Sequence, residues 1–430
     1  MTRFALAALA VTVLLLLALP PFVGLSIQNA LTKMLIASLF AAAFNLLAGQ
    51  AGLLSFGHAA YFGIGAIATL QLMRAIEDGS AALPTPLLPL AGLAAGLVVG
   101  AIAGYFATKR AGVYFSLVTL AIAELLHSLA PHWEGVFGGE AGLSSMRMPW
   151  AGISFGSALE VYYVTLGWVV VCLLLLWAYT RTPFGRLTLA LRENEQRVRF
   201  LGYDTHTTKV VVFAISAALS GAAGGLLAVA NETANYSLFS IHMSAQVVLH
   251  TFVGGAGFFF GPVIGASLLT LFSVFVSEAT RSWLLYQGIL FVLVMLFAPR
   301  GIGGVIDIHL RHWRRLEWGS LVPAYALSLV SACCIGMAVI FVVEATGILL
   351  SDHYAALRRS SGSAPPLTLF GQSWDPTSLM TWAVPLMLVV IGAVLLPPAR
   401  RQVRAAWDRI LERAAVETQP LHPTSLQPAR

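Results

Sequence analysis

The sequence has 430 residues, of which 58% are hydrophobic and only 10% are charged, and its formal net charge is +6 at pH 7. Soluble domains carry about 25% charged residues, so this composition excludes an ordinary soluble domain and indicates a polytopic membrane protein. The basic residues lie at the edges of apolar runs instead of forming the stripe typical of a nucleic-acid surface. We therefore expect membrane lipid, and no nucleic acid, as a partner.

Apolar runs recur along the whole chain, and a run of roughly 17 to 25 residues can cross a bilayer as a helix. The first run could also be a signal peptide, but no cleavage pattern of small residues follows it, so we expect a membrane anchor. The run at 244–257 is short and contains His250, which leaves a half-helix packed against protein as an alternative. The expected membrane helices are 4–22, 29–47, 51–71, 86–107, 112–130, 161–179, 208–230, 244–257, 259–277, 284–298, 321–343 and 379–396.

These runs predict an all-α fold: a polytopic membrane helix bundle with about ten core transmembrane helices and two additional C-terminal transmembrane helices. Twelve crossings that begin in the cytoplasm return 107–111, 180–207, 299–320 and 397–430 to the cytoplasmic side. Most basic residues then lie inside, as the positive-inside rule requires. Those left outside or at outer helix ends are Lys33, Arg74, Arg147, Arg281, Arg358 and Arg359.

Glycine is concentrated in residues 45–66, NLLAGQAGLLSFGHAAYFGIGA, at membrane depth. Such backbone usually lines a cavity or packs closely against protein. A weaker echo at 254–266, GGAGFFFGPVIGA, is consistent with an internal repeat. A ridge of glycines, each four residues apart, favours close packing of one helix on another: Gly92, Gly96, Gly100 and Gly104.

A polar island, residues 181–209, interrupts the apolar pattern with RTPFGRLTLALRENEQRVRFLGYDTHTTK. Its leucines and valine recur at helical spacing, and Gly202 stands where a short helix would end, so we expect one helix lying across the membrane surface. Two interpretations remain. The island is either a rigid contact through which a separate ATPase moves the membrane helices, or a basic loop that only obeys the positive-inside rule.

The C-terminal tail predicts an amphipathic helix. Val403, Trp407, Ile410 and Ala414 fall on one helical face, and arginines surround that face. We expect this helix to rest on anionic lipid headgroups.

Polar side chains within apolar runs are costly in lipid and are therefore functional candidates, although each could instead bond to a neighbouring helix. Glu124 and His127 share a helix face, but a di-iron site needs a second such pair and further glutamates, so we expect no metal. The chain has no G-x-x-x-x-G-K-[ST] phosphate loop, so ATP would be hydrolysed on another chain. The candidates for a translocation path are Asn45, Gln50, His58, Tyr61, Glu124, Gln246 and His250.

Seven blocks carry a resemblance. They stand in order at 52–66 (GLLSFGHAAYFGIGA), 112–126 (GVYFSLVTLAIAELL), 138–144 (GGEAGLS), 182–202 (TPFGRLTLALRENEQRVRFLG), 209–228 (KVVVFAISAALSGAAGGLLA), 254–266 and 296–304 (LFAPRGIGG). Together they resemble the membrane-spanning permease subunits of ATP-binding-cassette importers for branched-chain amino acids, of the Liv-type high-affinity system and its M-type subunit. The resemblance covers roughly residues 25–305.

The resemblance implies a permease core at 1–305 with a cytosolic coupling loop at 181–209. It implies as partners a second homologous permease, two cytosolic ATP-binding-cassette ATPases and an extracytoplasmic substrate-binding protein. Catalytic residues and cofactors are not expected on this chain. The implied location is the bacterial inner membrane, with both termini cytoplasmic. The residues expected at the ATPase contact are Arg192, Glu193, Asn194, Glu195 and Gly202.

Two features depart from the family pattern. Glu140 stands where the family more often has a small or neutral residue, which leaves the substrate open. Residues 306–430, with two further transmembrane helices and a basic amphipathic cytosolic tail, extend beyond the common core.

Ionisable groups are scarce in the core, so the expected cargo is a branched-chain or other apolar amino acid. Urea, short amides and aromatic acids remain alternatives as cargo. A proton-driven secondary carrier, with Glu124 as the titrating group, is a second class of function, and a membrane enzyme is a third.

Overall fold

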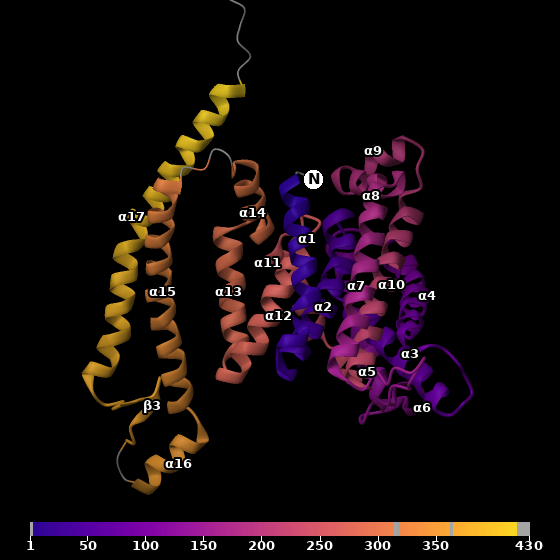
Figure 1. Cartoon of the computed structure of the whole chain (residues 1–430), viewed down its shortest axis with the longest axis horizontal. Coiled ribbons are helices and arrows are strands. Elements are labelled where there is room, and N and C mark those ends of the chain that lie inside the picture. Colours follow the sequence, from indigo (N-terminus) through magenta and orange to yellow (C-terminus); the bar gives the residue numbers. More distant parts are fainter. Residues whose placement is uncertain (1–2, 314–315, 317, 362–363, 419–430) are drawn as a thin grey trace, which may run out of the picture. The chain divides into compact units, whose positions relative to one another are not determined.

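The computed structural model describes residues 3–313, 316, 318–361 and 364–418, and Figure 1 shows its helices. The chain divides into two compact units, Met1–Ile306 and Asp307–Arg430. Helices dominate both units, which confirms the expected all-α membrane bundle. The strands that occur in the described residues form two short antiparallel pairs, β1 (Leu143–Ser144) with β2 (Thr233–Ala234) and β3 (Leu367–Leu369) with β4 (Gln372–Trp374).

The helices of the first unit follow the apolar runs. They are α1 Arg3–Ala18, α2 Leu25–Asn45, α3 Ala59–Glu77, α4 Pro89–Ala107, α5 Val113–Leu129, α6 Glu134–Phe137, α7 Ala158–Arg181, α8 Pro183–Glu193, α9 Glu195–Phe200, α10 Thr205–Asn231, α11 Ile241–Gly254, α12 Gly261–Ala279 and α13 Trp283–Phe297, followed by α14 Gly301–Arg311. The helices α8 and α9 lie at one end of this bundle with the start of α1, and α6 lies at the opposite end (Figure 1). The polar island and the N-terminus therefore share one side.

Among the described residues, nine helices are long and apolar enough to span a membrane, and α13 with α14, bent by 44°, would make a tenth. One of the twelve expected spans is shorter than required, since the 14-residue α11 replaces 244–257. The expected span 4–22 falls on α1 and on the short 3-10 turn Pro20–Phe22 that follows it. The helix α11 stops at Gly254 because Gly255 has φ +104, a left-handed conformation that glycine adopts without strain.

The glycine-rich segment is not the continuous helix that we expected at 51–71. The helix α2 passes into a π-turn, Leu46–Gln50, and residues 51–58 are irregular before α3 begins at Ala59. Gly52 has φ +72, which a residue with a side chain rarely adopts. Irregular backbone at membrane depth is tolerated where protein covers it, and π-turns are frequent at functional sites.

The glycine ridge of α4 packs directly on α10, as predicted. A methyl group added at Gly96 would meet the backbone of Ala217 and Gly221, and one at Gly104 would lie 3.1 Å from Phe213 Cβ. Because the ridge of α4 carries no side chains, the backbones of the two helices approach closely. Helix α10 is buried on most sides and forms the centre of the first unit, whereas the other face of α4 is exposed.

In the second unit, α15 (Trp318–Leu349) packs along α17 (Leu379–Thr418), and α16 (Asp352–Ser361) precedes the β3–β4 hairpin. The tail belongs to α17, and part of its apolar face packs inside this unit: Trp407 Nε1 donates to Tyr325 Oη at 2.9 Å, and Ile410 is 1% exposed. The partners of that face include Leu316 and Leu321. The side chain of Ala414 lies outside the described residues.

Candidate functional site

The polar island folds as two helices, α8 and α9, and not as the single helix that we expected. Asn194 separates them because its backbone is extended, with φ −160 and ψ 99. Its side-chain oxygen accepts the amide proton of Arg197 at 2.9 Å and so caps α9. Gly202 has φ +87, and its N–H donates to the Arg199 carbonyl at 3.0 Å, which ends the second helix.

Arg192 fastens the end of α8 to the glycine-rich segment. Its Nη1 donates to the carbonyl of Gly49 in the π-turn. Its aliphatic part lies over Gly52, where an added methyl group would stand 2.9 Å from Arg192 Cγ. Gly52 therefore lets the arginine side chain lie directly against the backbone of this segment.

A turn of the second glycine-rich segment, residues 255–256, packs against the π-turn that Arg192 contacts. A methyl group at Gly49 would collide with the Ala256 carbonyl, and one at Gly255 would lie 2.5 Å from the Arg300 carbonyl. We call this meeting point of residues 49–52, 255–256 and 300–301 the glycine junction. The two segments whose sequences echo each other thus lie side by side, and Arg192 joins the polar island to them.

A second link joins the island to α10. Glu195 Oε1 lies 2.5 Å from Lys209 Nζ, and Lys209 is 7% exposed. Partial burial raises the pKa of the Glu195 carboxyl, but the hydrogen bonds and charges of Lys209, Thr205 and Arg199 outweigh burial and lower that pKa overall. A charged, hydrogen-bonded pair at the base of α10 therefore holds α9 against the bundle.

Four of the five residues expected at an ATPase contact form contacts within the chain. Arg192 bonds to Gly49 and Glu195 pairs with Lys209. Asn194 caps α9, and Gly202 lies in the turn that ends it. Glu193 is exposed. The sequence reasoning missed two neighbouring apolar side chains, since Phe200 is 90% and Leu201 is 70% exposed. The tip of α9 thus presents an apolar surface that nothing in the described chain covers.

His58 and Tyr61, both fully buried, lie in an aromatic cluster in the core. Ser216 donates its hydroxyl proton to the Ala43 carbonyl at 2.6 Å, so His58 Nε2, 2.8 Å from the same hydroxyl oxygen, is the donor of the second bond. The rings of Phe44 and Tyr61 pack edge-on against His58 at 5.3 and 5.5 Å. His58 thereby joins α2, α3 and α10.

Gly57 and Gly63, which belong to the glycine-rich segment 45–66, approach other parts of the protein. A side chain at Gly57 would collide with the backbone carbonyl of Thr119, and one at Gly63 would come within 2.6 Å of the Phe239 ring. The structure gives both glycines a packing role between α3 and its neighbours.

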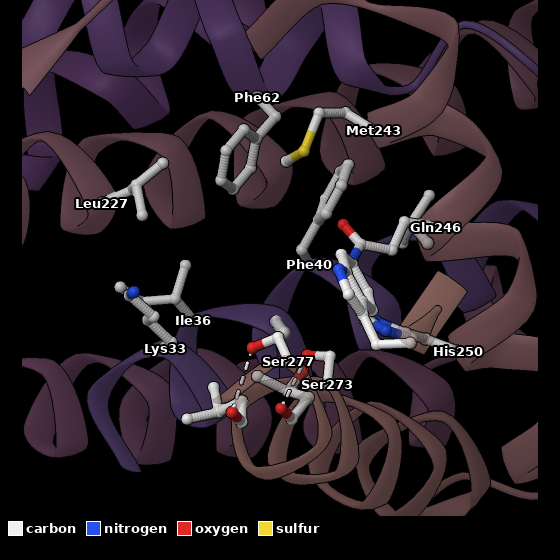
Figure 2. Close-up of a pocket in the computed structure, with 15 residues that line it drawn as sticks. Lys33, Ile36, Phe40, Phe62, Leu227, Met243, Gln246, His250, Ser273 and Ser277 are labelled. Carbon is white, nitrogen blue, oxygen red and sulfur yellow. Dashed lines mark hydrogen bonds between the residues drawn. The ribbon is translucent and has the colours of Figure 1, made fainter. Parts of the chain in front are cut away.

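Gln246 and His250 line a cavity of about 290 Å³ between α2, α11 and α12 (Figure 2). The other predicted translocation residues lie elsewhere: Asn45 and Gln50 at the end of α2 and in its π-turn, and Glu124 half-buried on α5. Sequence reasoning missed the remaining polar residues of the cavity, which are Lys33, Thr270, Ser273 and Ser277. The signal that could have found them is their spacing, since each helix contributes residues at i, i+3, i+4 and i+7.

Comparison with known proteins finds a matching family and several relatives, all of them transport permeases. The family described as "Branched-chain amino acid transport system / permease component" matches residues 26–299. The LivM permease protein of the high-affinity branched-chain amino acid transport system of Escherichia coli (strain K12) is 29% identical over 282 residues, which are 60% of this chain and 65% of the relative. The chain thus spans just under two thirds of the length of that relative.

Two further relatives are named for the transport of different substrates. The probable branched-chain amino acid transport permease protein LivM of Methanocaldococcus jannaschii is 27% identical over 48% of this chain and 64% of the relative. The autoinducer 2 import system permease protein LsrC of Salmonella typhi is 28% identical over 46% of this chain and 58% of the relative. No solved structure matches the chain significantly.

Proposed function

The chain belongs to the family of branched-chain amino acid transport permease components, and from this membership we propose that it is the transmembrane permease subunit of an ATP-driven importer for branched-chain or other apolar amino acids. The match over residues 26–299 is the observation that carries the proposal. The proposed partners are a second homologous permease, two cytosolic ATPases and an extracytoplasmic substrate-binding protein. The proposed location is the bacterial inner membrane, with both termini in the cytoplasm.

The polar island is the proposed ATPase contact. Its two helices are fixed to the bundle through Arg192 and through Glu195, while Glu193, Phe200 and Leu201 remain exposed. A rigid base with an exposed apolar tip suits transmission of movement from a partner chain, whereas a plain basic loop requires neither link. Phe200→Ser should weaken association with the ATPase, whereas Phe106→Ser, which changes an exposed phenylalanine of α4, should not.

The proposed translocation path uses the cavity at Gln246 and His250, because this cavity opens among helices that also meet the glycine junction through α2 and α11. Movement of α8 would reach α2 through the bond between Arg192 and Gly49. His58 and Tyr61 do not line this path. They support it indirectly, because they hold the core helices together.

The test is uptake of labelled leucine by vesicles that contain the complete complex. We expect uptake to require ATP, to survive collapse of the proton gradient and to disappear when the phosphate-loop lysine of the partner ATPase is replaced. Uptake that continues without ATP and stops when the gradient collapses would identify a proton-driven carrier instead.

The cargo requires its own test, because relatives in this family carry different names. LsrC is named for import of autoinducer 2, and urea, short amides and aromatic acids remain alternatives. A panel of these solutes in the same vesicles separates them from leucine, because each alternative predicts a different competitor.

A further inference from the structure

Three helices each contribute one face to the cavity of about 290 Å³, and Phe62 of α3, Leu227 of α10 and Trp283 of α13 complete its lining. Helix α2 contributes Lys33, Ile36 and Phe40, α11 contributes Met243, Gln246 and His250, and α12 contributes residues at the same spacing. Cavities of about 150 Å³ already admit a molecule the size of benzene. The cavity therefore has room for a small amino acid.

Lys33 brings a positive charge into this cavity. It lies eight residues after Leu25 within the membrane-span candidate Leu25–Gln50, about 12 Å along the helix at a rise of roughly 1.5 Å per residue. Its side chain is exposed, and within the part of the chain that the structure describes its ammonium group forms no ion pair. A cation at membrane depth is costly unless an anion or water meets it, and such residues commonly mark a substrate path.

The other residues that line the cavity form an apolar side and a polar side. In Figure 2, Phe62, Met243 and Leu227 stand on one side of the space, and Ser273 and Ser277 stand on the other. The rings of Phe40 and Phe62 pack together at 4.6 Å and form an apolar wall. This division fits a molecule that has both an apolar side chain and polar groups.

Two buried polar atoms in the lining lack hydrogen-bond partners. His250 Nε2 and Thr270 Oγ1 are buried without one, and His250 is 4% exposed. Buried polar groups normally have a partner, so unpaired ones call for an explanation such as a ligand or water. The described residues that line the cavity include no acidic side chain, so no carboxylate of the chain competes for the charge of Lys33.

Lys33 also lines a second cavity of about 280 Å³, together with Asn29, Arg147 and Asn231. Arg147 Nε is paired with Glu232 Oε1 at 3.0 Å and is 13% exposed. Arg147 is therefore already neutralised, whereas Lys33 is not. Lys33 thus stands where the two cavities adjoin, as the unneutralised cation common to both.

We propose that the cavity between α2, α11 and α12 is a binding site for an apolar amino acid, with Lys33 binding the carboxylate while Phe40, Phe62 and Met243 contact the side chain. Gln246 and the hydroxyls of α12 supply hydrogen-bond acceptors for the amino group. This inference rests on the proposed function. It adds a specific site within the membrane that selects for a carboxylate.

The first test measures the maximal leucine uptake of the complete complex at saturating binding protein. Lys33→Gln should lower that rate about tenfold or more, because a hydrogen bond to a charged group is lost, and Lys33→Arg should restore at least half of it. Arg281→Gln, which removes a cation between α12 and α13 outside both cavities, should have no effect. The amount of complex recovered from membranes controls for assembly. Wild-type rates in Lys33→Gln would overturn the proposal.

The second test needs no transport, so it separates failure of this site from failure of the proposed function. In a chain with Cys172, Cys333 and Cys334 replaced by serine, Ser273→Cys supplies a thiol in the cavity wall. Leucine should slow its labelling by a thiol reagent, and leucinamide, which lacks the carboxylate, should not. Adding Lys33→Gln should abolish the protection by leucine. Equal protection by both compounds, or none, would overturn the proposal.

A lipid headgroup is the other source of an anion for Lys33. The labelling is therefore repeated in vesicles of phosphatidylcholine alone and in vesicles with added phosphatidylglycerol. Protection by leucine in both supports the amino-acid site. Protection by phosphatidylglycerol alone would show that Lys33 binds lipid and would reject the proposal.

Discussion

The guanidinium of Arg192 donates a hydrogen bond to the carbonyl of Gly49 and so ties the last turn of α8 to the π-turn at the end of α2. The carbonyls of a π-turn are displaced from the regular helical pattern, so the Gly49 carbonyl can accept a hydrogen bond from outside its own helix. One residue of the polar island therefore holds the backbone of a helix that also lines the cavity at Lys33.

Arg192→Ala should lower leucine uptake about tenfold while ATP hydrolysis continues, because a charge-assisted hydrogen bond of about 1.5–3 kcal/mol is lost where movement would be transmitted. Arg186→Ala is the matched control, since Arg186 is an exposed arginine of the same helix. The measurement is the ratio of leucine molecules imported to ATP hydrolysed. An unchanged ratio in Arg192→Ala would mean that the bond has no part in coupling.

The bond between Glu195 and Lys209 should make docking of α9 depend on pH. The pKa of Glu195 is lowered below its ordinary value of 4.5 in the folded state. The stabilisation that this ion pair gives to the docked α9 is therefore fully present above pH 4.5. It is lost as the pH falls through the folded-state pKa. Hydrogen exchange of residues 195–200, corrected for intrinsic rates, should therefore accelerate only at acidic pH.

Glu195→Gln supplies the control for this pH dependence. In that variant α9 should exchange faster at neutral pH, and the further acceleration on acidification should be reduced. Equal exchange in the variant and the parent at pH 7 would show that the ion pair does not hold α9.

The glycine ridge allows a matched pair of substitutions. Gly96→Ala should destabilise the protein by about 1–3 kcal/mol, because its methyl group would overlap the backbone of α10. Gly167→Ala, also inside a membrane helix but with nothing within 4 Å, should be neutral or stabilising by up to about 1 kcal/mol. Thermal unfolding in detergent compares the two. Equal midpoints would contradict the tight packing of α4 on α10.

The second unit should be dispensable for basic transport. Its own hydrophobic cluster around Phe341 and Tyr354 lies within residues 307–430. A chain truncated after Arg311, which keeps α14 whole, should still assemble and import leucine. Failure to recover the truncated chain in the complex would show that the last two membrane helices belong to the core.

The sequence predicts much of this fold because apolar length and glycine spacing are local properties. The spans, the ridge at Gly92 to Gly104 and the end of the island at Gly202 all follow from such patterns. The break at Asn194 does not, because a side-chain cap outweighs the helical periodicity there. The irregular residues 51–58 were missed because tertiary packing, and not hydropathy, decides where α3 begins.

The candidate site was less predictable for a similar reason. Gln246 and His250 were identified as polar residues in an apolar run, but Lys33 was interpreted as an outer helix end. Only the packing of α2 against α11 and α12 places Lys33 beside them. The bonds of Arg192 and Glu195 join residues far apart in sequence, which periodicity does not reveal.

Competition for leucine uptake in vesicles that contain the complete complex tests the central claim most directly. The hydroxyl, amide and aromatic groups that line the cavity suit a zwitterion with an apolar side chain, whereas a strongly cationic or phosphorylated cargo would require carboxylates or arginines at depth. We predict strong inhibition by unlabelled valine, isoleucine and phenylalanine, and little by lysine or a phosphate ester. Strong inhibition by lysine or a phosphate ester, with none by the apolar amino acids, would contradict the account.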